Sequence, residues 1–399
     1  MKDSKRKILF VDYDNTTLQS LRRLFFNIEY NCFFARNVKD AFKILKEYDI
    51  ELIITEITMP AMDGCEFLKK IKGKYPKVIR VALSGYSNKE KLSNLLDQSL
   101  IKSYLFKPWD NIELINSIKR TFQLQDILTN EKLVNYIDNM ESLPTVPAVY
   151  QKINEMLIKN ESVEKITREV EKDQALASKI LKVANSAFYE AQTGSIKQAI
   201  MIIGLNNVKN IVISNALFHM KDVDKAEILW EHAIITNKIT GYIYKKIMLK
   251  KIPSEYSSAG LLHDVGRVII INYLNIENKK IDILLNNNPV DLEIRMGYEK
   301  KLIGFDHAKI GGYLLKRWEI PLPLVEVALF HHDPLNEIAT NKEIVGITYL
   351  ANIIAWKILK PDIKNDVIDE KVFESLEIPK DKFYKKIDEF IENESVNYN

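Results

Sequence analysis

The chain has 399 residues, which favours two or three domains. Hydrophobic residues make up 46% of it and charged residues 28%, as in soluble globular proteins. The 57 basic and 54 acidic residues leave a net charge of only +3, so composition does not argue for a nucleic-acid partner. The sequence shows no apolar run long enough to cross a bilayer and no signal-peptide core at its charged N-terminus. Two cysteines, Cys32 and Cys65, make no disulfide framework, and we expect a cytoplasmic protein.

Short apolar runs alternate with segments of helical period from residue 7 to about residue 122. The runs predict four buried strands, at residues 7–11, 52–55, 78–83 and 104–106, with a weaker fifth at 31–35. Strands that alternate with helices indicate a parallel sheet covered on both faces. We therefore predict an α/β, flavodoxin-like domain with a five-stranded parallel sheet over residues 1–125, with its site at the carboxyl ends of the strands.

The strand pattern ends at about residue 123. Residues 126–142 predict a polar linker helix, and almost everything from residue 143 has helical period. We expect an all-α domain over residues 143–399, with its core at about 143–355 and a C-terminal helical tail.

Four motifs in the first domain occur at the spacing of a phosphorylation site. They are the acidic segment Asp12-Tyr13-Asp14, then Glu56, Ser84 and Lys107. In this order they resemble the pocket of response regulator receiver domains. In that family an acidic pair and an acceptor aspartate hold Mg²⁺, while the hydroxyl residue and the lysine bind the transferred phosphoryl group.

The pocket departs from the receiver pattern at two positions. Tyr13 replaces the second acidic residue, and the adjacent Asp14 is expected to point elsewhere because successive residues of a strand end point to opposite sides. Glu56 replaces the acceptor and is one methylene longer, which is unfavourable for in-line phosphoryl transfer. We expect no Mg²⁺ here, and instead a permanent ion pair between Glu56 and Lys107.

Two interpretations of the degenerate receiver remain open. Glu56 could mimic the phosphorylated state, although one carboxylate carries less charge than a phosphoryl group. Ser84 and Tyr104 match the family's switch pair, which supports this interpretation. Alternatively, the domain has lost switching and serves in docking or dimerisation.

The helical domain contains all six histidines of the chain. His263-Asp264 is an adjacent pair of metal-ligand types on a predicted helix, and imidazole with carboxylate suits Fe, Mn or Zn. Helices of a bundle can bring distant ligands together. The candidate ligands are His232, His263, Asp264, His307, His331 and His332. His219 does not fit this series.

Residues 173–189 and 195–205, with the Leu-Pro-x-x-Pro opening at 143–147, resemble the HDOD family. This family is related to the HD and HD-GYP phosphohydrolases and is regarded as a signalling module. In HD-GYP proteins the metal ligands follow the order seen here, and Asn352 stands where their last aspartate is expected. Arg267 stands where they carry a lysine, and the Gly-Tyr-Pro motif is absent.

The combined resemblance implies a signal-transduction response regulator. An atypical, non-phosphorylated receiver would control an HDOD output domain that acts by binding a partner protein. The alternative is a metal-dependent phosphohydrolase acting on a nucleotide or phosphate ester, and a third possibility is phosphorylation at another carboxylate. A sensor kinase and a second copy of the chain are candidate partners, whereas nucleic acid and membrane are not expected.

Overall fold

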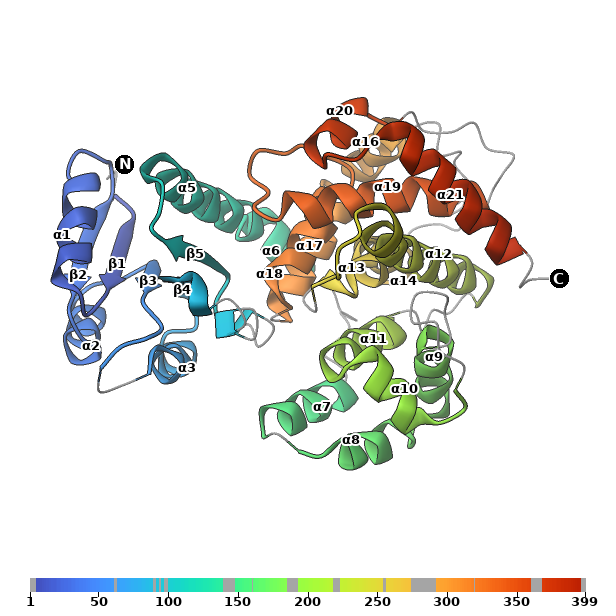
Figure 1. Cartoon of the computed structure of the whole chain (residues 1–399), viewed down its shortest axis with the longest axis horizontal. Coiled ribbons are helices and arrows are strands. Elements are labelled where there is room, and N and C mark those ends of the chain that lie inside the picture. Colours follow the sequence, from blue (N-terminus) through green and yellow to red (C-terminus); the bar gives the residue numbers. More distant parts are fainter. Residues whose placement is uncertain are drawn as a thin grey trace. The chain divides into compact units, whose positions relative to one another are not determined.

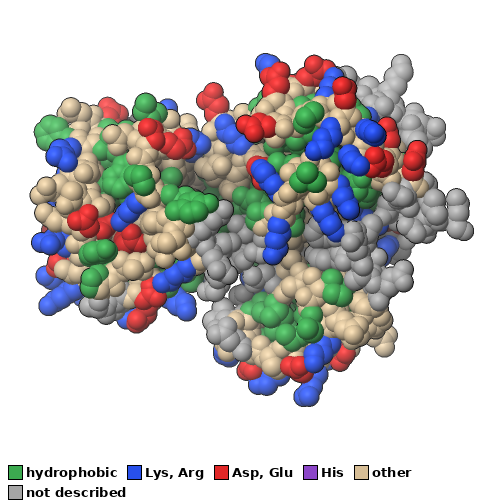
Figure 2. All heavy atoms as spheres, viewed as in Figure 1, with side chains coloured by type: hydrophobic (Ala, Val, Ile, Leu, Met, Phe, Trp, Pro, Cys, Tyr) green, Lys and Arg blue, Asp and Glu red, His purple; other side chains and the backbone are tan. Residues whose placement is uncertain are grey.

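The computed structural model describes residues 5–60, 63–88, 91–92, 95–96, 100–138, 148–159, 161–184, 193–217, 223–253, 256–273, 292–318, 320–359 and 368–395. The chain divides into two compact units, residues 1–119 and 120–399 (Figure 1). Basic and acidic side chains are mixed over the face shown in Figure 2. Among the residues with a described structure, no helix is long and apolar enough to span a membrane.

The first unit is built on a five-stranded parallel sheet with the strand order β2-β1-β3-β4-β5. The strands are β1 (Lys7–Val11), β2 (Asn31–Ala35), β3 (Leu52–Thr55), β4 (Ile79–Gly85) and β5 (Ser103–Lys107). This topology confirms the predicted flavodoxin-like class. β4 and β5 extend beyond the predicted runs, so that Ser84 and Lys107 lie within the strand ends.

The side chains of the central strands alternate between the two faces of this sheet, and both faces are buried. The unit contains the helices α1 (Asn15–Leu24), α2 (Val38–Glu47) and α3 (Gly64–Lys74), and the short η1 (Tyr86–Asn88) follows β4. Leu9 and Ile53 pack in one cluster with Phe67 of α3. Phe10 points to the other face, where its ring lies 5.1 Å from that of Phe25. The two-residue period of a strand explains this division.

The linker region differs from the single helix predicted at residues 126–142. Helix α5 (Asn111–Leu128) runs past residue 125, and a separate helix, α6 (Glu131–Asp138), follows. Asn130 causes the break, because its side-chain oxygen accepts hydrogen bonds from the backbone N–H groups of Lys132 and Leu133 and so caps a new helix. The domain boundaries at 125 and 142 stay predictions.

The second unit is helical throughout its described residues, as expected. Its helices after α6 are α7 (Ala148–Ile158), α8 (Val163–Val170), α9 (Gln174–Ala184), α10 (Ile196–Ile203), α11 (Leu205–Leu217), α12 (Val223–Tyr242), the π-helical η2 (Ile243–Ile247), α13 (Ala259–Leu262), α14 (Val265–Tyr273), α16 (Leu292–Ile303), α17 (His307–Arg317), α18 (Leu322–Phe330), α19 (Lys342–Leu359), α20 (Glu370–Ser375) and α21 (Lys380–Ser395). Residues 143–147 and 185–189 of the HDOD-like motifs, and His219, lie outside the described residues.

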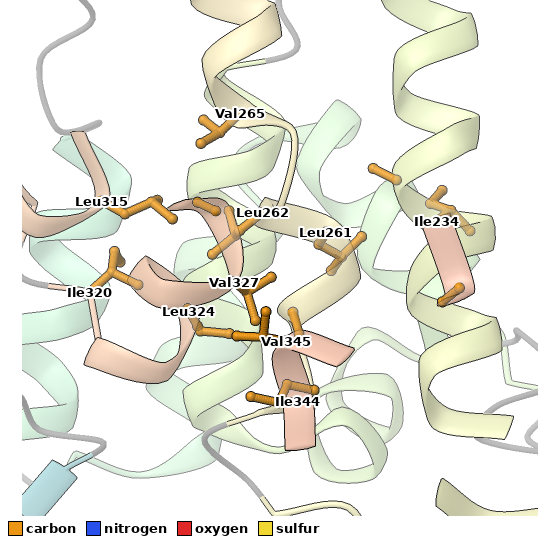
Figure 3. Close-up of a cluster of buried hydrophobic side chains, with 14 of the residues drawn as sticks. Ile234, Leu261, Leu262, Val265, Leu315, Ile320, Leu324, Val327, Ile344 and Val345 are labelled. Atoms are coloured by element: carbon orange, nitrogen blue, oxygen red, sulfur yellow. The ribbon is translucent and has the colours of Figure 1, made fainter. Parts of the chain in front are cut away.

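Helices α12 to α19 form the core that carries the histidines. α12 packs against α13 and α19, and α17 packs against α14 and α18. Figure 3 shows Leu262 of α13, Val327 of α18 and Val345 of α19 gathered in this core. A largely apolar surround is a low-dielectric setting, so the polar groups inside it must find partners.

Candidate functional site

The first group of candidate residues lies at the carboxyl ends of the parallel strands. Asp12 follows β1, Glu56 follows β3, Ser84 is near the end of β4 and Lys107 ends β5. Parallel strands bring these positions to one edge of the sheet. The carboxylates are 2% and 5% exposed, for Asp12 and Glu56, so their charges must be compensated locally.

Lys107 bridges the two carboxylates. Its Nζ donates to Asp12 Oδ2 at 2.5 Å and to Glu56 Oε2 at 2.6 Å. The ion pair expected from the sequence is therefore present, and it includes Asp12 as a second anionic partner. An ammonium group thus lies between two oxygens that receivers use for a metal ion.

The other oxygen of Glu56 is also fully engaged. Oε1 accepts hydrogen bonds from the backbone of Ile57 at 2.7 Å and of Thr58 at 3.0 Å, and from Ser84 Oγ at 2.6 Å. Asn88 Nδ2 donates to Ser84 Oγ at 2.9 Å and so fixes the hydroxyl. Asn88 was not predicted, because nothing in its sequence context distinguishes it from an ordinary turn residue.

Asp14 joins this network through its backbone N–H, which donates to Asp12 Oδ1 at 2.9 Å, while its side chain is used elsewhere. Both carboxylate oxygens of Asp14 cap α1, accepting from the backbone N–H groups of Thr16 and Thr17 at 3.0 Å each. Tyr13 is 49% exposed. The Tyr104 ring packs edge-on against Phe106, with centroids 5.4 Å apart. Asp14 therefore does not replace the carboxylate that Tyr13 removes.

Charge states follow from these contacts. Burial raises the pKa of Glu56, but hydrogen bonds from Lys107 and Ser84 lower it by more, so its pKa lies below the ordinary value. At Asp12 burial outweighs the effect of Lys107, and the pKa is raised. Burial lowers the pKa of Lys107, whereas hydrogen bonds to the two carboxylates raise it by more, so the pKa is raised overall. The ammonium and the Glu56 carboxylate stay ionised at neutral pH.

The second group of candidate residues converges in the core of the helical unit. His232 lies on α12, Asp306 caps α17 just before His307, and His331 and His332 follow the last turn of α18. His263 and Asp264 lie at the junction of α13 and α14, not inside one helix as predicted. The His263 ring bonds back to the helix, with Nδ1 2.8 Å from Gly260 O, which helps to end α13 there.

Two sets of potential ligand atoms share Asp264, and within each set the atoms lie within 4.8 Å of one another. One set combines Asp264 with His307, His331 and His332. The other combines Asp264 with His232 and His263. Asn352 of α19 joins the second set through a contact of 2.8 Å between its Oδ1 and His232 Nε2. The fold thus brings all seven predicted metal-site residues together.

The outer nitrogens of three histidines have acceptors. Nδ1 of His263 faces the Gly260 carbonyl, and Nδ1 of His331 faces the carbonyls of Val327 and Ala328 at 3.2 and 3.0 Å. Nδ1 of His307 faces a carboxylate at 2.7 Å. An acceptor beside Nδ1 places the proton on that nitrogen, so the Nε2 lone pairs point inward. Neutral imidazoles with inward lone pairs are the form that binds a metal.

The carboxylate beside His307 belongs to Glu299, which the sequence did not indicate. Its Oε2 accepts from the backbone N–H of His307 at 2.8 Å as well as from the ring. Glu299 lies on α16, and the chain turns at Gly304, with φ of 84°, before α17 begins. Because the two residues lie on different helices joined by a turn, no helical period in the sequence predicts the contact between Glu299 and His307.

Arg267 lies beside the shared carboxylate, with Nη1 3.1 Å from Asp264 Oδ2. Burial raises the pKa of Asp264, but the Arg267 guanidinium and the nearby imidazoles lower it by more, to well below its usual range. Burial lowers the pKa of His263 to about 4, and it lowers those of His232 and His331 as well. At neutral pH the imidazoles of His232, His263 and His331 are therefore neutral and the Asp264 carboxylate is ionised.

Close backbone contact fixes the spacing of the two halves of the cluster. A Cβ atom on Gly266 of α14 would lie 1.9 Å from the carbonyl oxygen of His307. Glycine is therefore required where α14 crosses α17. This contact holds Asp264 near His307, at 3.3 Å between Oδ1 and Nε2.

Family models match both units. The response regulator receiver domain matches residues 8–119, and the HDOD domain matches residues 143–334. Among curated proteins, the hydrogenase transcriptional regulatory protein HoxA of Cupriavidus necator is 26% identical over 127 residues, which are 32% of this chain and 26% of that protein. The transcriptional regulatory protein FlgR of Helicobacter pylori is 34% identical over 117 residues, 29% of each chain. An uncharacterized protein of Treponema pallidum is 24% identical over 246 residues, 59% of this chain and 46% of that protein. The chain thus matches less than half the length of each of these relatives.

Solved structures resemble each unit. The signal receiver domain of an HD domain-containing protein from Pseudomonas fluorescens is 29% identical, with a TM-score of 0.29, and covers 31% of this chain and 90% of that one. An HDOD domain protein from Geobacter sulfurreducens is 24% identical, with a TM-score of 0.46, and covers 62% of this chain and 84% of that one. The resemblances drawn from the sequence motifs are confirmed by the two family models.

Proposed function

We propose that this chain, a response regulator receiver domain followed by an HDOD domain, is a signalling protein whose receiver is held in one state without phosphorylation. The observation that carries the proposal is the Lys107 ammonium between the carboxylates of Asp12 and Glu56, at 2.5 and 2.6 Å. The Glu56 carboxylate is thus a fixed anion in the pocket, and Lys107 is the cation that joins it to Asp12.

Phosphoryl transfer needs a free nucleophilic oxygen and a metal in tight octahedral coordination. Both oxygens of Glu56 accept hydrogen bonds from fixed groups, so neither is positioned for in-line attack. Tyr13 supplies no carboxylate, and Asp14 is occupied in capping α1. The pocket therefore disfavours both phosphoryl transfer to Glu56 and the binding of Mg²⁺.

Of the two interpretations of the receiver, the contact of Ser84 with Glu56 supports the phosphorylation mimic. In receivers the hydroxyl at this position binds the transferred phosphoryl group, and here Ser84 Oγ donates to Glu56 at 2.6 Å. Lys107 contacts the same carboxylate. Both residues thus bind Glu56 as they would bind the phosphoryl oxygens, with about one charge in place of about two. A docking role for the receiver stays compatible with the same locked pocket.

We propose further that the HDOD domain binds a transition metal and transmits the signal by binding another protein. The residues present fit a metal, because Asp264 Oδ1 and His331 Nε2 are buried side-chain atoms without a hydrogen-bond partner. Asp264, His307, His331 and His332 could hold it, and Glu299 would orient His307. When bound, such an ion acts as a Lewis acid and lowers the pKa of a coordinated water.

The receiver proposal is tested by the intact mass of the full chain after incubation with acetyl phosphate and Mg²⁺. The wild type should gain no phosphoryl group. The Tyr13→Asp/Glu56→Asp double variant restores both missing groups and should gain one, whereas Glu56→Asp alone should gain less. A stoichiometric phosphoryl addition to the wild type that disappears in Glu56→Gln would contradict the proposal.

A metal-dependent phosphohydrolase is the second candidate function, and the convergence of lone pairs on Asp264 is the observation that favours it. Against it stand the amide of Asn352 in place of a carboxylate and the missing Gly-Tyr-Pro motif. The metal-loaded full chain should not hydrolyse a panel of phosphomonoesters, phosphodiesters and cyclic dinucleotides. Turnover that is lost in His331→Ala would make the hydrolase the better conclusion.

A further inference from the structure

We infer that the histidine cluster is built for one metal ion, held by Asp264, His307, His331 and His332, and that hydrogen bonds close the half around His232 to metal. This inference rests on the proposed metal binding and adds the number of ions and their place. The order of candidate ligands along the chain would count His232, His263 and Asn352 as equal members of the site, whereas we infer that they do not bind the ion.

Spacing alone does not separate the two halves. Neighbouring ligands of one ion at about 2.1 Å lie about 3.0 to 3.4 Å apart. In the first half, Asp264 Oδ1 is 3.3 Å from His307 Nε2 and 3.4 Å from His331 Nε2, and His307 Nε2 is 2.9 Å from His332 Nε2. In the second half, His232 Nε2 is 3.3 Å from His263 Nε2. The distinction must come from where the protons lie.

In the first half, the electron pairs of Asp264, His307 and His331 converge. His332 Nε2, at 2.9 Å from His307 Nε2, can carry a proton in the metal-free protein. Glu299 holds the proton of His307 on Nδ1, and the last carbonyls of α18 hold that of His331 on Nδ1. Their Nε2 atoms therefore face Asp264 Oδ1 as acceptors facing an acceptor. Asp264 Oδ1 and His331 Nε2 have no donor in reach. Buried acceptors that face one another require a cation between them.

In the second half, the lone pair of His232 is already used. Its Nε2 lies 2.8 Å from the amide of Asn352. If the amide oxygen faces the ring, Nε2 carries a proton and cannot bind metal. If the amide is turned so that its nitrogen faces the ring, Nε2 accepts that proton and its lone pair is occupied. Either orientation engages Nε2 of His232, and the neutral amide adds no anionic ligand beside it.

The remaining ligands of the second half are compensated as well. The Arg267 guanidinium lies 3.1 Å from Asp264 Oδ2, so this oxygen faces a permanent cation. The His232 ring stacks on Trp356, with centroids 4.0 Å apart, which fixes the ring toward Asn352. His263 Nε2 lies 3.3 Å from His232 Nε2, and in the first amide orientation it shares, as a second acceptor, the N–H group that donates to Asn352. The Nε2 atoms and the Asp264 Oδ2 atom of this half therefore have partners without a metal, whereas His232 Nδ1, the other nitrogen of that ring, has no hydrogen-bond partner among the described residues.

The ligand set of the first half, three imidazole nitrogens and one carboxylate oxygen, suits Zn²⁺ and its spectroscopic substitute Co²⁺. The test uses the full chain, stripped with chelator, reloaded with Zn²⁺, freed of unbound metal and measured for zinc per chain. A Co²⁺-loaded sample gives an absorption spectrum that depends on the ligands. Circular dichroism checks that each variant is folded.

The wild type should hold about one zinc ion per chain. The His307→Ala and His332→Gln variants should lose this ion. Because His332 is only partly buried, His332→Gln should disturb the fold less than His307→Ala. His232→Ala should keep the ion and leave the Co²⁺ spectrum unchanged. Asn352→Asp should raise the content to about two ions, because it supplies the missing carboxylate.

The outcomes separate the inference from the proposal beneath it. A wild type without zinc would overturn the proposed metal binding itself. Two ions in the wild type, or loss of the ion in His232→Ala with His332→Gln still loaded, would overturn the single-site inference while leaving metal binding intact. A zinc content in Asn352→Asp that stays at the wild-type value would show that Asn352 does not close the second half.

Discussion

Replacing Lys107 by methionine removes the cation that contacts both Asp12 and Glu56, and in the described residues of the pocket no other side-chain cation contacts both carboxylates. Methionine keeps most of the apolar stem, so the change isolates the charge. Lys107 makes two charge-assisted hydrogen bonds and is 21% exposed. Such bonds contribute about 1.5–3 kcal/mol each. Partial exposure favours the lower value, and protonation of Asp12 relieves part of the loss. We expect the free energy of unfolding of the receiver to fall by about 2–3 kcal/mol at pH 7.

Hydrogen exchange followed by mass spectrometry measures this loss in the full chain, using peptides from β1 and β3 as reporters of the receiver. Lys91→Met is the matched control, because Lys91 pairs with Asp63 at 3.0 Å while the two side chains are 41% and 52% exposed. That change should alter stability by no more than about 0.5 kcal/mol.

The effect of Glu56→Gln should reverse its sign between two backgrounds. In the wild type it removes one anionic partner of Lys107 and should destabilise the receiver. In Lys107→Met it removes one of two uncompensated carboxylates and should stabilise it. Equal losses in both backgrounds would show that the two residues are not coupled and would refute the locked-pocket reasoning.

The contacts of Lys107 with Glu56 and Asp12 also predict that the stability of the receiver depends on pH. The pKa of Glu56 is lowered in the folded state, so its stabilising contribution is present above the unfolded pKa of about 4.3 and is lost as pH falls through the folded value. The pKa of Asp12 is raised, so its contribution has the opposite direction: it is present at low pH and is lost as pH rises through the folded value. Lys107→Met should raise both pKa values, and its destabilising effect should therefore shrink between pH 7 and pH 4.

Two further predictions concern the helical unit. Glu299→Gln removes the charge that orients His307 and should weaken zinc binding by about 10-fold or more in competition with a chromophoric chelator, whereas Glu343→Gln, on an exposed ion pair, should not change the affinity. Gly266→Ala should destabilise this unit by more than about 3 kcal/mol in chemical denaturation, since its Cβ would strike the backbone of His307. Gly297→Ala, with nothing within 4 Å of the added Cβ, should stabilise it by about 0.5–1 kcal/mol, and a loss of stability there similar to that at Gly266 would contradict the steric reasoning.

The sequence predicts the fold well because the apolar runs of the strands and the 3.6-residue period of the helices are both clear in it. The strand at 52–55 occurs at the predicted residues and is buried throughout, and the weaker candidate at 31–35 also forms a strand, half-buried at the edge of the sheet. The break at Asn130 was missed because a side-chain cap overrides an otherwise continuous helical pattern. The position of His263 at a helix junction was missed for a similar reason, since its ring bonds to the Gly260 carbonyl.

The membership of the two sites could be predicted, but not their chemistry. The resemblance to the two families was enough to select Glu56, Lys107 and Asp264. It could not show that Lys107 also contacts Asp12, because that contact depends on the register of β1, β3, β4 and β5. Nor could it show which ring nitrogen of each histidine carries the proton. That depends on carbonyl and carboxylate acceptors, such as Glu299, which have no sequence pattern.

Native mass spectrometry of the full chain tests the central account in one measurement. The protein is exposed to acetyl phosphate and Mg²⁺, then to Zn²⁺, and is desalted before its mass is recorded. We predict the mass of the unmodified chain plus one zinc ion, with no phosphoryl group. A chain that carries a phosphoryl group would contradict the locked receiver, and a chain that carries two zinc ions, or none, would contradict the single metal site at Asp264.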